Sequence, residues 1–446
     1  MSTPPAESRR TLTFLPLVAA TYFMVAGGPY GLEELVAKAG YPRTFLILLI
    51  TPVLWSIPTA LMEAELSAAI PAEGGYYVWV RRTLGPFWGF FEAWLAMMAS
   101  IFDMAICATI FVLYFGRIWP VAIAGWRGVA VGAIVIGVSA AWNIRGAKAV
   151  GWGSVWLSAP LLGPFVVMIV LAVVHKPAPF AANASLPHTD LIGGLLVAMW
   201  NYMGWNAAST IAGEVRDPQK TYPRVLGAAT VMVIATYVLA VGACAWAGVD
   251  PKGWTTGSWT DAARQIGGPW LSFAVIVGGL TCGLGMINAL MMSYSRLPMV
   301  LAEDGYLPPP LAVRSPRTGA PVVSIIVCSV AWAGSLLLGF DRLVELDVLI
   351  YGCALLLSFI ALVRLRVMEP GLPRPFRVPG GMLGVSVLGV GPMFLVGLGF
   401  YRGQFHGAAS EDRVVAVLLA ILVACGPAVY AASRRRRRRP TEVRFK

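Results

Sequence analysis

The chain has 446 residues, of which 58% are hydrophobic and only 13% are charged. Soluble domains carry about a quarter of their residues as Asp, Glu, Lys and Arg, so this composition excludes an ordinary soluble protein. The net charge of +12 does not indicate nucleic-acid binding, because Lys and Arg are concentrated in loops on one side of the predicted topology. The composition therefore indicates a polytopic membrane protein.

Twelve apolar runs are long enough to cross a hydrocarbon core of ~30 Å as helices. They cover residues 11–36, 43–69, 86–115, 126–142, 151–174, 190–213, 224–248, 270–298, 320–339, 345–366, 384–402 and 413–432. The first run continues past any small-residue cleavage site, so we interpret it as a membrane span and not as a signal peptide. The distribution of Lys and Arg predicts that both termini are cytoplasmic. The run Arg434 to Arg439 is expected to anchor this topology against anionic lipid, with a regulatory or partner-binding role as the alternative.

The stretch VAGGPYGLEE, residues 25–34, interrupts the first span. Two glycines and a proline remove helical hydrogen bonds at membrane depth, where non-helical backbone is tolerated only inside protein or beside a water-filled cavity. We expect the helix to break at residues 27–29. Glu33 and Glu34 follow the break by enough helix to lie about 12 Å further out, so they are expected to line an outer vestibule.

Carboxylates inside predicted spans are costly and are functional hypotheses by default. Asp103 lies near the middle of the third span and is a candidate site for a substrate amine or a proton, with a structural role as the alternative. Glu65 lies near the inner end of the second span and is a candidate for an inner-gate ion pair with a loop arginine. Glu63 and Glu92 are interpreted as solvated or packing residues. The segment YYVWVRR, residues 76–82, is expected at the inner interface with its rings toward lipid.

The sixth span contains a second predicted break, near residues 203–206. Spans 1–5 and 6–10 form two blocks, and since five is odd, the second block enters the membrane in the opposite direction. Interruptions at corresponding positions of two inverted halves are the best sequence indication of a transporter binding site. The ends of broken helices offer N–H groups to a carboxylate and carbonyl groups to an ammonium. The paired breaks therefore predict a site for a zwitterion or a small amine.

The candidate site residues flank the two breaks and the third span. The expected substrate-binding residues are Ala26, Gly27, Gly28, Tyr30, Gly31, Asp103, Trp205, Asn206 and Ser209. The expected gating or coupling residues are Glu65, Asp103, Tyr22, Trp200 and Tyr202. Among the aromatic residues, Trp205 is favoured as the cover over a substrate cation because it adjoins Asn206, whereas packing roles stay open for Trp200 and Tyr202. The histidines and cysteines show no metal-ligand spacing, so no metal, cofactor or enzyme site is expected.

The stretch GGPYGLEE resembles a signature of the amino acid/polyamine/organocation (APC) permeases. Residues 55–90, 209–226, 301–312 and 364–381 resemble the branch that contains plant polyamine-uptake and L-type amino acid transporters. The resemblance implies an all-α membrane fold of twelve transmembrane helices, with a LeuT-type 5+5 inverted repeat and broken helices 1 and 6. It also implies secondary active transport by alternating access, usually coupled to protons.

Two positions depart from the resembling proteins. The fifth span lacks the lysine that some proton-coupled APC permeases carry, which weakens that route of proton coupling. Asn206 stands where plant polyamine transporters carry an aspartate. Because Asp103 then remains as the one clear midplane carboxylate, the sequence favours an amino acid or small amine as substrate, with a polyamine as the alternative.

The expected organisation is a cytoplasmic tail, two five-helix repeats, two further helices and a basic tail. Their ranges are 1–10, 11–174, 190–366, 384–432 and 433–446. The predicted function is a permease in the plasma membrane, driven by H⁺, whose partners are its small-molecule substrate and the lipid bilayer. A channel or a transporter-like sensor is the alternative from a different class; it is disfavoured because neither a filter motif nor a soluble output domain is found.

Overall fold

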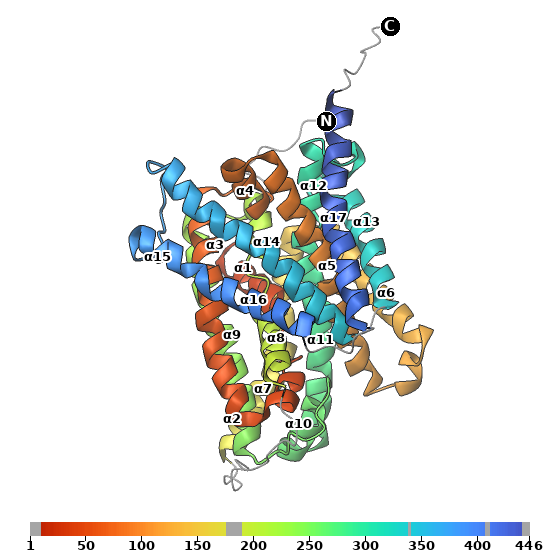
Figure 1. Ribbon diagram of the computed structural model, residues 1–446. Coiled ribbons are helices and arrows are strands. Elements are labelled where there is room, and N and C mark those ends of the chain that lie inside the picture. Colours follow the sequence, from red (N-terminus) through yellow and green to blue (C-terminus); the bar gives the residue numbers. More distant parts are fainter. Residues whose placement is uncertain (1–9, 175–189, 338–339, 406–410, 439–446) are drawn as a thin grey trace.

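The computed structural model describes residues 10–174, 190–337, 340–405 and 411–438, which are almost entirely helical (Figure 1). The first helices are α1 (Phe14–Val25), α2 (Glu33–Thr51), α3 (Ile57–Ala69), α4 (Tyr76–Leu84), α5 (Pro86–Gly116), α6 (Trp126–Asn143) and α7 (Ala147–Val174). They are followed by α8 (Leu191–Asn201), α9 (Pro218–Trp246), α10 (Trp259–Gly267), α11 (Pro269–Tyr294) and α12 (Arg296–Glu303). The last are α13 (Val322–Gly334), α14 (Phe340–Met368), α15 (Gly381–Leu388), α16 (Val390–Phe405) and α17 (Glu411–Arg438).

Within the described residues, seven helical segments are long and apolar enough to cross a membrane. They are Glu33–Ala69, Pro86–Gly116, Ala147–Val174, Pro218–Trp246, Pro269–Glu303, Asp347–Met368 and Gly381–Tyr401. Shorter apolar helices are Phe14–Val25, Leu191–Asn201, Val322–Leu337 and Ala420–Arg434. An all-helical membrane fold is thus confirmed. Helices α1 and α8 belong to the shorter group because each of them ends at a predicted break.

The core of the bundle is built around α5, which packs against both α11 and α14. Helix α1 lies against α7, α9 and α11, while α8 packs against α2 and α14. Figure 1 shows α4 and α12 together at one end of the bundle, called the α4 end below, and α10 at the opposite end. The two helices that are interrupted, α1 and α8, therefore end inside the bundle and not at its surface.

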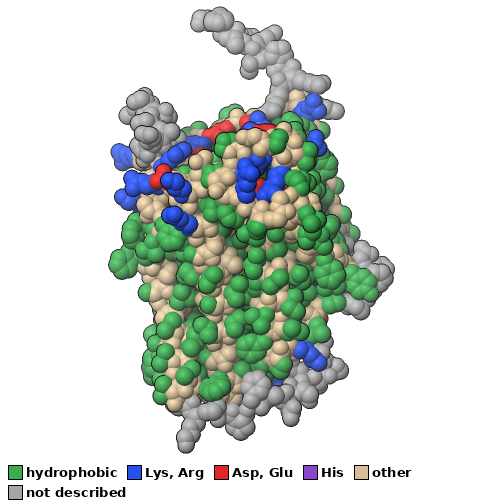
Figure 2. Space-filling model, turned by 90° about the vertical axis from the view of Figure 1, so that its left-hand side faces the viewer, with side chains coloured by type: hydrophobic (Ala, Val, Ile, Leu, Met, Phe, Trp, Pro, Cys, Tyr) green, Lys and Arg blue, Asp and Glu red, His purple; other side chains and the backbone are tan. Residues whose placement is uncertain are grey.

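The outer surface of the bundle separates apolar from charged side chains. Hydrophobic side chains cover the flank seen in Figure 2, whereas Lys and Arg gather at the α4 end. Large apolar side chains on the flanks are strongly exposed, among them Leu46, Val138 and Trp156. An apolar belt with a cationic rim at one end is the arrangement expected of a protein that sits in lipid.

The first break is present and covers residues 26–32. Gly27 and Gly28 adopt φ values of +57° and +85°, which L-residues with a Cβ avoid. Pro29 has no N–H to continue the helix, and Gly31 follows with φ +97°. The predicted break at 27–29 is confirmed, and it is wider than expected because Gly31 prolongs the non-helical backbone.

The second break lies between α8 and the 3₁₀ helix η4 (Ala207–Glu214). Residues 202–206 are not helical, and Gly204 has a φ of +92°. The chain then continues as 3₁₀ helix, which a non-helical residue, Ile211, divides into two short pieces. The predicted break near 203–206 is confirmed. The 3₁₀ backbone of η4 and its kink at Ile211 mark this segment as a candidate hinge.

The prediction for the α4 segment is wrong. Tyr76, Tyr77 and Trp79 are buried in protein and do not face lipid, because α5 and α14 pack over α4. The indole Nε1 of Trp79 donates to the carbonyl of Ile70 at 2.9 Å. Helix α4 is therefore an integral part of the protein interior at this end.

Candidate functional site

The two helix breaks lie against each other in the middle of the bundle. A Cβ at Gly204 would overlap the carbonyl oxygen of Met24, so the second break fits the end of α1 only without a side chain at this position. The hydroxyl of Tyr237, on α9, donates to the carbonyl of Asn201 at 2.7 Å and lies 3.5 Å from that of Ala26. The breaks predicted from two distant stretches of sequence therefore form a single site.

Hydrogen bonds within the protein occupy much of the backbone at the first break. The N–H of Gly27 donates to the carbonyl of Tyr22 at 3.4 Å, and the N–H of Gly31 donates to Glu33 Oε2 at 2.6 Å. The indole of Trp259 donates to the carbonyl of Pro29 at 3.0 Å. The N–H groups of Gly27 and Gly28 were expected to be available to a substrate carboxylate, and of these the Gly27 N–H is bonded within the protein.

Glu33 does not line a vestibule. It is fully buried, and besides Gly31 it accepts from the Tyr114 hydroxyl at 2.6 Å and from the Gly257 N–H at 2.9 Å. Three donors on one carboxylate compensate for its removal from water. Glu33 thus ties the first break to α5 and to the loop before α10. Glu34 is half-buried and lies 3.3 Å from the Thr256 N–H.

Asp103 and Asp347 form a pair of buried carboxylates beside the breaks, called the acidic pair below. Asp103, on α5, accepts from the Trp200 indole at 3.3 Å and from the Tyr294 hydroxyl at 2.9 Å. Asp347, on α14, is fully buried and interacts electrostatically with Asp103; the Trp200 indole lies beside it, but neither oxygen accepts a well-formed hydrogen bond from a described residue. An unpaired buried carboxylate beside a second one is costly unless a cation joins them.

Asp347 is not among the residues predicted from the sequence. It lies only two residues inside the predicted span 345–366. Helix α14 begins earlier, at Phe340, and this shift places Asp347 inside the protein. A search for every carboxylate within one turn of a predicted span end would have found it.

Tyr351 connects α14 with the second break. Its hydroxyl donates to Asn206 Oδ1 at 3.0 Å and accepts from the Gly204 N–H at 3.2 Å. Since Tyr351 follows Asp347 by four residues, both side chains project from the same face of α14. Asn206 therefore lies on the side of the second break that faces the acidic pair, although an amide stands in place of a third carboxylate.

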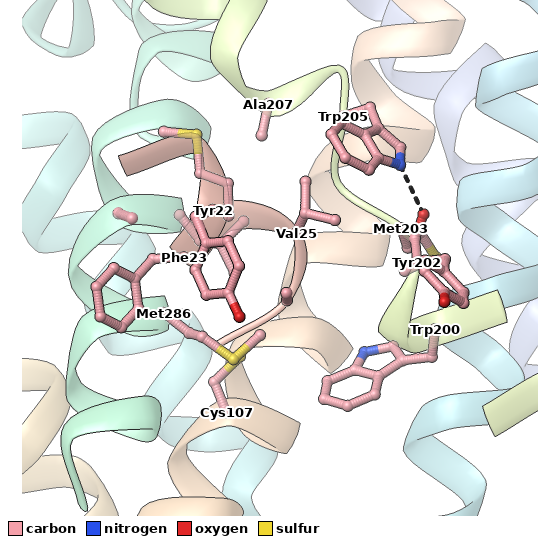
Figure 3. Packing of buried hydrophobic residues seen from close by; sticks show 14 of the residues in the cluster. Tyr22, Phe23, Val25, Cys107, Trp200, Tyr202, Met203, Trp205, Ala207 and Met286 are labelled. Carbon is pink, nitrogen blue, oxygen red and sulfur yellow. Dashed lines mark hydrogen bonds between the residues drawn. The ribbon is translucent and has the colours of Figure 1, made fainter. Parts of the chain in front are cut away.

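The aromatic residues predicted near the breaks are all buried around them (Figure 3). A Cβ at Gly31 would be 3.0 Å from Cζ3 of Trp200, so this ring lies between the first break and Asp103. Trp205, favoured from the sequence, donates instead to the Tyr202 carbonyl at 2.8 Å, which the dashed line in Figure 3 marks. Among these rings, Trp200 is the one that donates to the acidic pair.

Other predicted residues make contacts at the edges of the site. The hydroxyls of Tyr30 and Tyr202 donate to the carbonyls of Val275 and Leu48 at 2.9 and 3.0 Å. Tyr22 is buried and its hydroxyl has no partner among the described residues. Ser209 donates to the Asn206 carbonyl at 2.6 Å and lies on η4, closer to the α4 end. Ala26 and Gly28 are buried within the first break.

Glu65 forms the ion pair expected of it, at the α4 end. Arg366 donates to its two oxygens at 2.8 and 2.5 Å, and the Val378 N–H donates to it at 2.7 Å. Arg374 lies 3.4 Å away. Desolvation lowers the pKa of the Arg374 guanidinium, and the charge of Glu65 opposes that shift. These contacts tie α3 to the end of α14 and the loop that follows; a gating role remains a prediction.

Comparisons with known proteins agree with this architecture. A family model described as amino acid permease matches residues 18–425. The polyamine transporter PUT1 of Oryza sativa subsp. japonica is 36% identical over 401 residues, which are 88% of this chain and 74% of the relative. The polyamine transporter RMV1 of Arabidopsis thaliana is 34% identical over 400 residues, 87% of this chain and 80% of the relative. An uncharacterized transporter of Mycobacterium tuberculosis is 29% identical over 403 residues, 86% of each chain.

Proposed function

The chain belongs to the amino acid permease family, and from this premise we propose that it is a secondary active transporter for polyamines in the plasma membrane. In this proposal twelve transmembrane helices form two inverted repeats, residues 11–174 and 190–366, followed by helices within 384–432. The two breaks that meet at the centre of the bundle support this arrangement. The Lys and Arg side chains at the α4 end (Figure 2) support a cytoplasmic position for that end and both tails, 1–10 and 433–446.

The acidic pair carries the proposal for the substrate. One midplane carboxylate suits one amine and favours an amino acid, which was the expectation from the sequence. Asp347 adds a second carboxylate with both oxygens unpartnered, and a diamine or polyamine supplies two or more ammonium groups. The names of the relatives in Oryza sativa and Arabidopsis thaliana support the same substrate class.

The chemistry of the site fits an organic dication. An ammonium group brings three N–H donors, and the unpartnered oxygens of Asp347 accept them at short, charge-assisted distances. The Trp200 ring beside Asp103 offers a cation–π surface for a second ammonium or its methylene neighbours. Carbonyl groups at the ends of α1 and α8 add partial negative charge. In this mechanism the substrate replaces the electrostatic repulsion within the acidic pair by attraction.

Alternating access requires that the α4 end opens while the opposite end stays closed. Ion pairs join the first repeat to the second repeat and to the loop after it, and they close the α4 end: Glu65 with Arg366, Glu73 with Arg314, Arg82 with Glu369, and Arg81 with Asp304. At the opposite end, the contacts of Glu33 with Tyr114 and Gly257 hold the first break in place. In this proposal, each transport cycle breaks the closing contacts at one end of the bundle while those at the opposite end are kept.

The proposal is tested with purified full-length protein in proteoliposomes. Uptake of labelled putrescine is measured with spermidine, lysine or leucine as competitor, and counterflow distinguishes a carrier from a channel. We expect saturable putrescine uptake and counterflow, inhibited by spermidine and not by leucine. Inhibition or counterflow by amino acids, with no effect of either polyamine, would overturn the polyamine assignment. The substrate would then be an amino acid, as the sequence favoured.

A further inference from the structure

A second group of buried acidic side chains lies nearer the α4 end than the acidic pair. It consists of Glu63 on α3, Glu92 on α5 and Tyr76 on α4, and is called the inner acidic cluster below. Their exposed fractions are 0%, 1% and 1%. From the sequence, both glutamates are interpreted as solvated or packing residues. Because both side chains are buried, the interpretation as solvated residues is wrong.

The polar atoms of the cluster are largely without partners. The Ser358 hydroxyl donates to Glu92 Oε1 at 2.5 Å. Among the described residues, Glu92 Oε2, both carboxylate oxygens of Glu63 and the Tyr76 hydroxyl make no well-formed hydrogen bond, although the Ser209 hydroxyl lies beside Glu63. Tyr76 interacts electrostatically with both glutamates, and Glu92 interacts with Glu63. The three side chains therefore share one buried region of the protein.

The groups that face the cluster come from every neighbouring element, and no cation is among them. Within the described part of the chain, Ser209 of η4 lies beside Glu63, Tyr222 of α9 and Tyr351 of α14 interact with it electrostatically, and Ser358 of α14 donates to Glu92. No described Lys, Arg or His pairs with either glutamate. Two ionised carboxylates in such a place would cost several kcal/mol each. The inner acidic cluster therefore needs a bound positive charge.

The helix spacing aligns the cluster with the acidic pair. Glu92 precedes Asp103 by eleven residues on α5, which is about three turns and ~16 Å along the same helix face. Ser358 follows Asp347 by the same spacing on α14, which packs along α5. Tyr351 lies on α14 between them and interacts electrostatically with Glu63 and with Asp347. The inner acidic cluster and the acidic pair thus follow each other along the packed helices α5 and α14.

We propose that the inner acidic cluster binds the proton whose movement drives substrate transport. This assignment rests on the proposed transport function. A proton fits because it forms an O–H bond to one carboxylate oxygen, needs no cavity and removes the buried negative charge of that group. The proton comes from water on one side of the membrane and is returned to water on the other, so no further reactant is required.

The position of the cluster explains how opening releases the proton. The turn before α4 packs directly on the hinge segment: the Gly74 N–H donates to the Thr210 carbonyl at 2.9 Å, and Gly75 leaves no room for a Cβ beside Ser209. Movement of η4 away from this turn removes the cover over Glu63. Water then reaches the carboxylates, which makes their ionised forms favourable. The same movement opens the substrate site toward the α4 end.

The test separates proton coupling from substrate exchange in proteoliposomes of the full-length protein. Accumulation of labelled putrescine under an imposed pH difference is compared with counterflow at equal pH for the wild type, Glu63→Gln and Glu92→Gln. Asp261→Asn, which changes an exposed carboxylate in α10, is the matched control. We expect the glutamine variants to lose pH-driven accumulation by about tenfold or more, as for coupled sites, and to keep counterflow near the wild-type rate.

Each other outcome has a defined meaning. Wild-type accumulation by both glutamine variants overturns the proton assignment. Loss of counterflow together with accumulation in both variants assigns a structural role to the cluster and also overturns it. A wild type that carries amino acids instead of putrescine overturns the proposed substrate alone, and the same comparison is then made with the amino acid.

Discussion

Gly204 packs so tightly against the carbonyl oxygen of Met24 that only a residue without a Cβ fits there. Gly204 belongs to the second break and Met24 to the last turn of α1, so the two interruptions are complementary in shape. Because Gly204 also has a φ of +92°, its backbone conformation and its packing both require glycine.

Substitution of Gly204 by alanine is therefore expected to abolish or strongly reduce transport in protein that still inserts. The left-handed conformation alone costs about 1–2 kcal/mol for a residue with a Cβ, and the overlap with Met24 adds to it. The matched control is Gly253→Ala, since Gly253 has φ +72° with open space around it. Equal uptake by both variants, normalised to inserted protein, would show that the contact between the breaks is dispensable.

Neutralising either member of the acidic pair is expected to weaken polyamine binding. Loss of a hydrogen bond to a charged group costs about 1.5–3 kcal/mol, so Asp103→Asn and Asp347→Asn each reduce affinity for putrescine roughly ten- to a hundredfold. The double variant tests whether the two carboxylates act on one ligand, because coupled residues give non-additive effects. Wild-type affinity in Asp347→Asn would remove this residue from the site.

An added carboxylate at position 206 is expected to increase the preference for polycations. Asn206→Asp keeps the acceptor oxygen that Tyr351 contacts at 3.0 Å and adds a charge next to the acidic pair. The expected gain for spermidine over a monoamine is about 1–3 kcal/mol. Asn206→Ala is the control, because it removes the contact with Tyr351 without adding charge. Competition assays that rank the amines identically in wild type and Asn206→Asp would contradict this prediction.

The aromatic residue with the greater effect on substrate affinity is expected to be Trp200. Its indole donates to Asp103, whereas that of Trp205 donates to the carbonyl of Tyr202 in its own segment. Trp200→Ala should lower affinity for a cationic substrate by roughly 0.5–2 kcal/mol, and Trp205→Ala should chiefly lower thermal stability. Binding and unfolding measurements on both variants check this order, which is the reverse of that favoured by the sequence.

The buried ion pair at the α4 end is expected to matter more for stability than the exposed one beside it. Glu65 and Arg366 have side-chain exposures of 1% and 10%, whereas Glu369 and Arg82 have 31% and 42%. Breaking a buried pair costs about 3–5 kcal/mol, and an exposed pair contributes at most about 1 kcal/mol. Thermal unfolding should therefore be lowered clearly by Glu65→Gln and little by Glu369→Gln. A similar shift in both variants would argue against Glu65 as a structural lock.

Much of the site could be predicted because it depends on local chemistry. Gly27, Gly28 and Pro29 interrupt a helix wherever they occur together, since two favour positive φ and the third lacks an N–H. The same reasoning found the second break around Gly204. An ion pair of Glu65 was also predicted, because an intramembrane carboxylate near a positively charged interface needs a partner. The main partner is Arg366 at the end of α14 and not a loop arginine, although Arg374 of the following loop lies 3.4 Å away.

Other features escaped prediction because distance from a helix end is a poor measure of burial. Glu33 read as an outer residue, yet Tyr114 and Gly257 surround it. Glu63 and Glu92 read as solvated or packing residues, yet α4 covers them with Tyr76. Asp347 was not predicted at all, because it stands at the start of the apolar run, whereas the helix begins earlier.

By itself the sequence determined the membrane character, the helical class and the positions of both breaks, because hydropathy, the missing N–H of proline and the free φ of glycine are properties of single residues and short runs. Only the tertiary structure decided which charges meet. Asp103 and Asp347 lie far apart along the chain. Glu63 and Glu92 are likewise distant in sequence from Tyr351 and Ser358, the α14 residues with which they interact. Their proximity results from the packing of α5, α4 and α14 against one another. No local pattern encodes that packing, since one helix face can meet any of several neighbours.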